Sequence, residues 1–161
     1  MITAEVLRDT LAYDPETGEF SWRASRKGVR ISDPVGTVDT RGYRRIHLNR
    51  KLYWAHRLAW LYVYGEWPST GLDHVNCVKS DNRIANLRLA TKVQNGRNVG
   101  KRAHNTSGYK GVTFDASRQK WMAKIFVEKK HICLGRFANR EEAAEAYKAA
   151  AERYFGEFSR Y

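Results

Sequence analysis

Asp73 and His74 place a carboxylate beside an imidazole, and amide side chains follow them at short intervals along the chain. A neutral imidazole is the natural general base near pH 7. Carboxylate and amide oxygens are hard ligands, so they suit Mg²⁺ or Mn²⁺ rather than a metal that prefers thiolate ligands. Core packing does not require so many base-type and ligand-type side chains in one stretch, so they indicate base catalysis beside a divalent ion. The amides are Asn76, Asn82, Asn86, Asn95 and Asn98.

Short apolar pieces flank these residues and predict the elements that position them. Residues 72–75 and 87–90 have the composition of two brief strands, joined by a polar loop. The pattern turns helical after Thr91, whose hydroxyl can accept a hydrogen bond from an amide of the first turn. A strand–loop–strand–helix unit would bring the Asp–His pair against Asn95 on the helix.

A structural role is the alternative for each of these side chains. An isolated Asp–His pair in a loop is more often structural than catalytic, and asparagine often caps helices or braces turns. On that interpretation Asn82 and Asn86 brace the loop. Asn98 either supports the site or ends the helix before Gly100.

The same stretch resembles the ββα-metal core of HNH endonucleases, particularly the phage and intron-homing branch. The matching segments, in the family's order, are residues 72–76, 81–88 and 94–98. The resemblance implies hydrolysis of a DNA phosphodiester, with His74 deprotonating the attacking water. It also implies one Mg²⁺ or Mn²⁺ ion, held by Asp73 and Asn95 at the scissile phosphate.

Three further side chains receive supporting roles. The resemblance assigns Asn86 to bracing the loop between the strands through backbone hydrogen bonds, and we interpret Asn82 as a second brace. His56 stands in a His-Arg-Leu sequence that precedes the motif in many HNH relatives. It could approach the metal or the scissile phosphate, but we prefer the interpretation that it buttresses the fold.

The charge of the chain predicts a polyanionic partner. Its 161 residues carry a formal charge of +12, with a pI near 9.9. Before residue 101 there are 16 basic and 10 acidic residues, and after residue 100 there are 13 and 7, so both parts are basic. No apolar run approaches membrane-spanning length, and the N-terminus is not a signal sequence. Cys77 and Cys133 are too few for a disulfide framework or a zinc site, so we expect a reduced, cytoplasmic protein.

The sequence before the motif predicts an N-terminal extension of mixed structure. The expected helices and strands cover residues 3–12, 19–22, 35–38, 43–48 and 53–64. A basic stretch over residues 23–30 is either an arm that contacts phosphates or a solvated loop. Residues 99–106 lack apolar periodicity and predict a basic linker, which either follows the phosphate backbone or is an ordinary tether.

A different pattern begins at Ser107 and predicts three antiparallel strands packed on one helix. Alternation in the second strand places Trp121, Ala123, Ile125 and Val127 on one face and Met122, Lys124 and Phe126 on the other. The helix starts near Asn139 and is rich in alanine. Residues 107–158 resemble the Apetala-two/ethylene-response-factor DNA-binding domain. The matching segments are residues 108–112, 120–121, 134–137, 141–144, 146–147 and 156–158.

This second resemblance implies that the sheet, not the helix, lies in the major groove of DNA. The predicted DNA contacts are Lys110, Arg118, Lys120, Lys124, His131 and Arg136. Four positions that hold arginine or tryptophan in plant relatives differ here: Thr113, Phe126, His131 and Cys133. We therefore expect phosphate contacts rather than a plant-like target sequence. The alternative is a sheet face that is basic and merely solvated.

Together these patterns predict an α+β protein in two parts. Residues 1–98 form an HNH ββα-metal nuclease domain with its N-terminal extension, and residues 107–161 form a three-stranded DNA-binding domain. We expect a phage- or mobile-element-encoded endonuclease that acts on double-stranded DNA in a bacterial host, with no small-molecule substrate. The main alternative is a non-catalytic DNA-binding protein with a decayed HNH core. The other is an RNA-binding protein whose tryptophans stack on unpaired bases.

Overall fold

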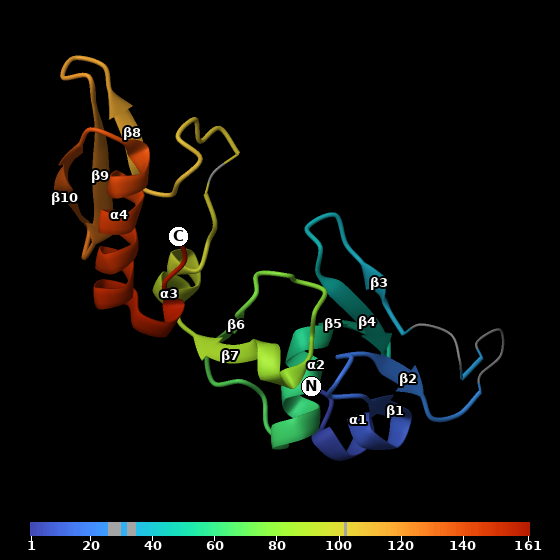
Figure 1. Cartoon of the computed structure of the whole chain (residues 1–161). Helices are drawn as coiled ribbons and strands as arrows, with labels where there is room; N and C mark the ends of the chain where they lie inside the picture. The colour runs from blue at the N-terminus through green and yellow to red at the C-terminus, as the bar shows by residue number, and fades with distance from the viewer. Residues whose placement is uncertain (26–29, 32–34, 102) are drawn as a thin grey trace. The chain divides into compact units, whose positions relative to one another are not determined.

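A computed structural model describes residues 1–25, 30–31, 35–101 and 103–161 (Figure 1). The chain divides into two compact units, Met1–Lys92 and Val93–Tyr161, and each is described by itself. The basic stretch predicted over residues 23–30 falls partly on residues 26–29, outside the described residues, as does position 102 of the predicted linker. No helix among the described residues is long and apolar enough to cross a membrane.

The first unit opens with a short helix and a hairpin. Helix α1, Ala4–Thr10, begins at Thr3, whose side chain accepts a hydrogen bond from the amide of Val6. It ends two residues before the predicted limit, because Leu11 is already extended and starts strand β1. Strand β1, Leu11–Tyr13, pairs antiparallel with β2, Phe20–Trp22, across a turn that contains Gly18.

A three-stranded antiparallel sheet follows, in the order β3-β4-β5. Its strands are β3, Thr37–Val38; β4, Arg44–Leu48; and β5, Lys51–Trp54. Helix α2, Ala55–Tyr64, starts later than the prediction, because Tyr53 and Trp54 extend β5 and pair with β4. The helix ends at Gly65, which adopts a left-handed conformation with φ of 79°.

The Asp–His motif lies on a two-stranded antiparallel ribbon of the first unit. Strand β6, Gly71–His74, pairs with β7, Leu87–Ala90, and the single-turn helix η1, Ile84–Asn86, leads into β7. Both strands fall where the sequence predicts them. Helix α3, Lys92–Arg97, follows after one residue and is grouped with the second unit, whereas the predicted nuclease domain extends to residue 98.

The core of the first unit joins its N-terminal elements to α2 and to the ribbon. Leu7, Leu11 and Phe20, from α1 and the β1–β2 hairpin, belong to the same buried cluster as Leu58 and Leu87. The remaining fully enclosed members are Ile2, Val35, Ile46, Leu48, Ala55, Ala59 and Leu61. The N-terminal residues therefore complete the core beneath the polar loop between β6 and β7.

The second unit is a three-stranded antiparallel sheet covered by one long helix. Its sheet order is β10-β9-β8, formed by β8, Val112–Asp115; β9, Lys120–Val127; and β10, Lys130–Phe137. Helix α4, Arg140–Phe155, begins at Asn139, whose side chain accepts a hydrogen bond from the amide of Glu142, and the turn η2, Gly156–Phe158, follows it. Ala123 and Ile125 are buried against this helix. The α+β class and the three-strand, one-helix order are as predicted.

Candidate active site and nucleic-acid interface

Asp73 and His74 are consecutive residues at the end of β6, and both are buried, with 5% of each residue exposed. Successive side chains of a strand point in opposite directions, and these two contact different partners. Asp73 stands opposite Arg88 in the register of the ribbon, while His74 stands opposite Leu87 and reaches the loop. The ribbon thus separates the ion pair of the carboxylate from the contacts of the imidazole.

The carboxylate of Asp73 forms a nearly buried ion pair with Arg88. Its Oδ2 accepts hydrogen bonds from Nε and Nη2 of Arg88 at 3.0 and 2.8 Å. The side chains of Arg88 and Asp73 are only 16% and 6% exposed, so the pair has little solvent around it. Arg88 is not among the site residues predicted from the sequence. Its position opposite Asp73 depends on the register of β6 and β7, which the sequence pattern does not specify.

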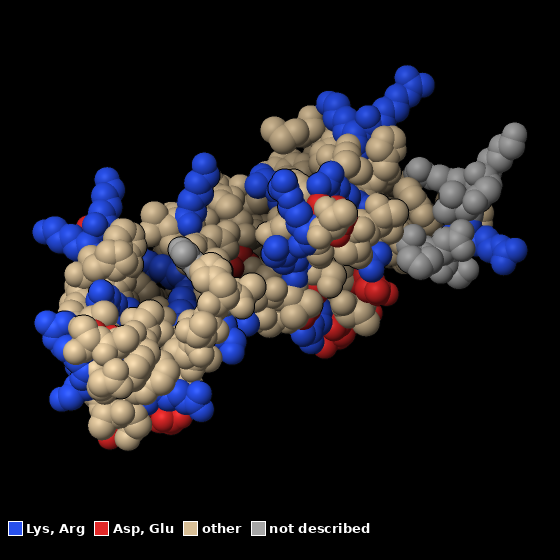
Figure 2. Space-filling view, turned by 90° about the horizontal axis from the view of Figure 1, so that it is seen from above, with Lys and Arg blue, Asp and Glu red and all other residues tan. Residues whose placement is uncertain are grey.

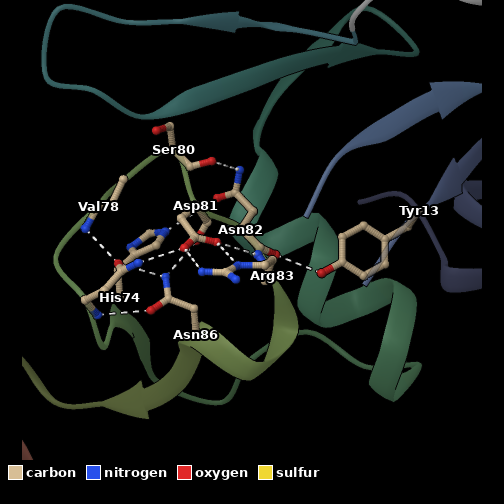
Figure 3. Close-up of polar contacts among 9 residues, drawn as sticks. Tyr13, His74, Val78, Ser80, Asp81, Asn82, Arg83 and Asn86 are labelled. Atoms are coloured by element: carbon tan, nitrogen blue, oxygen red, sulfur yellow. Dashed lines mark hydrogen bonds and ion pairs between the residues drawn. The ribbon is translucent and has the colours of Figure 1, made fainter. Parts of the chain in front are cut away.

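The imidazole of His74 is oriented by Asn82, which is itself 1% exposed (Figure 3). The Nδ2 group of Asn82 donates to the carbonyl of Ser80 at 3.1 Å, so its Oδ1 is the atom that lies 3.4 Å from Nε2 of His74. An amide oxygen is an acceptor, and therefore the network assigns the ring proton to Nε2. The ring lone pair is then on Nδ1, which is the nitrogen able to act as a base.

The surroundings of His74 keep its ring neutral near pH 7. Burial lowers the pKa of His74 below its ordinary value, and the hydrogen bond to Asn82 and the charge of Asp73 oppose that shift only in part. A divalent ion bound nearby would act in the same direction, because a positive charge disfavours the imidazolium. A neutral imidazole is the protonation state that a general base requires.

Four polar side chains connect the loop between the strands through hydrogen bonds. Oδ1 of Asn86 accepts a hydrogen bond from the backbone of Asn76 at 3.0 Å, and its Nδ2 donates to the Asn76 side chain and to the Asp81 carbonyl. The Asp81 carboxylate accepts from Asn76 and from Arg83, and these bonds hold the pKa of Asp81 near 2. Asn86 thus bonds the backbone on both sides of the loop, at Asn76 and at Asp81.

Aromatic rings pack beside His74 on the side of α2. The ring of His56 lies 5.2 Å from that of His74 at a steep angle, and Tyr43 lies 5.6 and 6.0 Å from these two rings. Trp54 stacks on His56 at 6.1 Å. Within the described part of the chain, Nδ1 of His56 is buried and makes no hydrogen bond. His56 therefore packs the site as a neutral ring.

His56 should make the first unit sensitive to acid. Burial, followed by the proximity of His74, lowers the pKa of His56 to about 3, against an ordinary value of 6.5. The unfolded chain takes up this proton between those values and the folded chain does not, so stability should fall as pH drops from 6.5 towards 3. The slope is about 1.4 kcal/mol per pH unit. Urea unfolding across this pH range measures it.

The matched comparison replaces one ring at a time. His56→Phe keeps the ring packing and should flatten the acid dependence, whereas His47→Phe, at an exposed site on β4, should keep the wild-type slope. Equal slopes for His56→Phe and the wild-type chain would contradict this account.

The donor set predicted for a metal has hard oxygen chemistry. Asp73 offers a carboxylate and Asn95, on α3, offers an amide oxygen, which fits Mg²⁺ or Mn²⁺. Because α3 is grouped with the second unit, the pairing of Asn95 with Asp73 stays a prediction. The described residues contain no cluster of three or more His, Cys, Asp or Glu side chains that would bind a metal by themselves.

The second unit presents basic residues on the sheet face that points away from α4. Lys120, Lys124 and His131 are exposed there, and the His131 ring contacts Phe126 with centroids 4.8 Å apart. Figure 2 shows more Lys and Arg than Asp and Glu side chains on the visible surface of this unit, among mostly uncharged residues. This face therefore has the charge of a phosphate-binding surface.

The other three predicted DNA contacts are engaged within the second unit. Arg118 and Arg136 both bond to the Asp115 carboxylate, at 3.4 and 3.2 Å, and the pKa of Asp115 is lowered to about 2, chiefly by Ser117. The ammonium of Lys110 donates to the backbone carbonyls of Arg97 and Val99. A DNA contact by Lys110 would have to displace these two bonds.

Two segments of the chain match known protein families. Residues 53–97 match the family model described as HNH endonuclease, and residues 107–157 match the AP2 domain. The chain is also similar to an uncharacterised HNH endonuclease of Acanthamoeba polyphaga mimivirus, with 28% identity over 146 residues. That alignment covers 90% of this chain and 68% of the relative. The first matched segment contains Asp73, His74 and Asn95.

Proposed function

We propose that this chain, which carries an HNH endonuclease segment at residues 53–97 and an AP2 domain at residues 107–157, is a metal-dependent endonuclease of double-stranded DNA. The observation that carries the proposal is the buried ring of His74, whose Nε2 lies 3.4 Å from Oδ1 of Asn82 and whose pKa is lowered by burial. A similar chain from a mimivirus bears the name of an HNH endonuclease.

His74 is the general base of the proposed reaction. Its Nδ1 takes a proton from the water that attacks the scissile phosphate, while Nε2–H remains hydrogen-bonded to Oδ1 of Asn82. That bond also stabilises the imidazolium that forms, because the amide oxygen accepts a hydrogen bond from a cation more strongly than from a neutral ring. The loop network around Asn86 keeps Asn82 and the ribbon in register.

Asp73 and Asn95 would hold the divalent ion. A bound Mg²⁺ or Mn²⁺ would supply the Lewis acid that stabilises charge on the phosphate oxygens and the leaving oxygen. Arg88 fixes the orientation of the Asp73 carboxylate through two hydrogen bonds to one of its oxygens. The exposed sheet of the AP2 domain would hold the duplex, with Lys120 and Lys124 on its phosphates.

The sheet contacts should appear in the salt dependence of DNA binding. Replacing Lys120 or Lys124 with glutamine removes one phosphate contact, so the slope of log K against log[salt] should become shallower by about 0.9 per residue. Lys148→Gln, which makes the same change on α4, should leave the slope unchanged. Fluorescence anisotropy with duplex DNA between 50 and 300 mM salt measures it, and three equal slopes would count against the sheet as the binding face.

The test of the proposed function is cleavage of a supercoiled plasmid with Mg²⁺, with Mn²⁺ and with EDTA. We expect metal-dependent conversion to the nicked form, because one catalytic centre per chain cuts one strand at a time. A plasmid library of fragments from the source genome provides target sequences. DNA binding without cleavage in every metal condition would favour the binding-only alternative.

The viral relative is consistent with an enzyme encoded by a virus or mobile element and acting inside a host cell.

A further inference from the structure

We propose that the N-terminal β1–β2 hairpin positions the general base: Tyr13 and Gly18 hold the backbone of Asn82, and Asn82 orients His74. The inference rests on the proposed function, since His74 has this role only if the chain is a nuclease. Neither hairpin residue lies in the segment that matches the HNH family, which begins at residue 53.

Tyr13 binds the loop at Asn82, with its hydroxyl pointing toward the loop from the side of the hairpin (Figure 3). Its hydroxyl donates to the backbone carbonyl of Asn82 at 2.8 Å and also forms a hydrogen bond with the backbone of Ile84. Burial raises the pKa of Tyr13 to about 12, so the hydroxyl keeps its proton throughout the range in which an enzyme works. Its ring is fixed by Phe20 and Tyr62, with centroids at 4.9 and 5.6 Å.

Gly18, in the turn of the hairpin, packs closely against the same peptide. It has φ of +74°, and a Cβ placed on it would fall against the backbone nitrogen of Arg83 and 2.6 Å from the carbonyl carbon of Asn82. The turn therefore lies in direct contact with the Asn82–Arg83 peptide, with no space for a side chain. Two contacts from one hairpin thus converge on one peptide of the loop.

Asn82 transmits this position to the catalytic ring. Within the described part of the chain, its side chain bonds the Ser80 carbonyl on one side and Nε2 of His74 on the other. The distance to His74, 3.4 Å, is already at the long end of the hydrogen-bond range. A shift of the Asn82 backbone by a few tenths of an ångström would therefore break the bond that places the ring proton on Nε2.

The loss of that bond would affect turnover more than DNA binding. His74 would then populate both neutral tautomers, and only the Nε2–H form has its lone pair on Nδ1. Misplaced catalytic groups lower rate constants steeply, by up to about a hundredfold per ångström. Neither hairpin residue is among the predicted DNA contacts.

The first test removes one hydroxyl. In the full chain, Tyr13→Phe should lower kcat for plasmid nicking about 10-fold with little change in KM. Long-range ¹H–¹⁵N spectra of the histidine rings should show that His74 loses its preference for the Nε2–H tautomer. The control is Tyr62→Phe, which removes a hydroxyl from the same aromatic cluster, where the group bonds Arg23 and not the loop. It should keep the wild-type kcat and the wild-type His74 signals.

The second test displaces the turn. Gly18→Ala introduces a methyl group against the Asn82–Arg83 peptide, whereas Gly65→Ala makes the same change at φ of +79° with no atom within 4 Å. Both variants strain a left-handed residue, and Gly18→Ala should lose more stability because its methyl group also meets the loop backbone. Only Gly18→Ala should lower kcat and alter the His74 spectrum.

The outcomes distinguish failure of the hairpin proposal from failure of the proposed function. The proposal is overturned if Tyr13→Phe and Gly18→Ala keep the wild-type His74 spectrum, or if each control lowers kcat as much as its partner. If the wild-type chain cuts no DNA, the proposed function fails by itself. The His74 spectra of the four variants then still decide whether the hairpin positions this ring.

Discussion

Replacing His74 with alanine should lower the rate of DNA cleavage about a thousandfold while DNA affinity stays within about twofold of wild type. The expected loss lies within the range for removal of a positioned general base. Affinity should persist because the phosphate contacts proposed for Lys120 and Lys124 lie on the sheet of the second unit. Single-turnover nicking and anisotropy binding, measured with one protein preparation, separate the two quantities.

Added imidazole provides the control for this variant. His74→Ala leaves a buried space between Tyr43 and His56, because their rings pack against the His74 ring. Free imidazole that occupies this space should restore part of the rate, with an acid limb set by the pKa of free imidazole. Joint loss of cleavage, DNA binding and the thermal unfolding transition would indicate misfolding and would remove the support for base catalysis.

Arg88→Met should lower the free energy of unfolding of the first unit by about 3 kcal/mol. The reason is the Asp73 carboxylate, which would stay buried after losing its ion pair, and breaking such a pair from one side costs about 3–5 kcal/mol. Divalent ions should stabilise this variant more than the wild-type chain, because a positive charge beside Asp73 has been removed. Urea unfolding with and without Mg²⁺ measures both effects.

Arg83→Met is the matched control for Arg88→Met. Arg83 also makes two bonds to a carboxylate, that of Asp81, but its side chain is 48% exposed. Pairs of this kind contribute about 0–1 kcal/mol, so the control should lose much less stability. The double variant Asp73→Asn with Arg88→Met should recover much of the loss, since it leaves no buried charge. Equal losses for the two single variants would show that burial of Asp73 is not the cause.

The sequence predicts the parts of this fold whose signals are local. Both strands of the Asp–His ribbon, the Thr3 and Asn139 helix starts and the three-strand order of the second unit follow from patterns that span a few residues each. The assignment of the two families also rests on such short motifs, and the comparisons agree with it. These features depend on side-chain periodicity and capping chemistry, which neighbours in sequence determine.

The residues that the sequence does not predict act through distant pairing. Tyr53 and Trp54 end β5 rather than forming the first turn of a helix, because β4 supplies a partner that periodicity does not reveal. Tyr13 reaches Asn82 across 69 residues, and Arg88 meets Asp73 only through the register of the ribbon. Unit boundaries have the same origin: α3 continues the matched HNH segment in sequence but packs with the second unit.

The core of the first unit determines whether the segment that matches the HNH family can fold in another protein. Leu7, Leu11 and Phe20 lie outside the matched segment, yet they enclose Leu58 and Leu87 within it. A graft of residues 53–97 alone would expose the apolar side of α2 and β7 to water and would aggregate instead of folding. A transferred segment that folds therefore has to include residues 2–20. For the same reason, a crossover between related chains should be tolerated better before α1 than between the β1–β2 hairpin and the Asp–His motif.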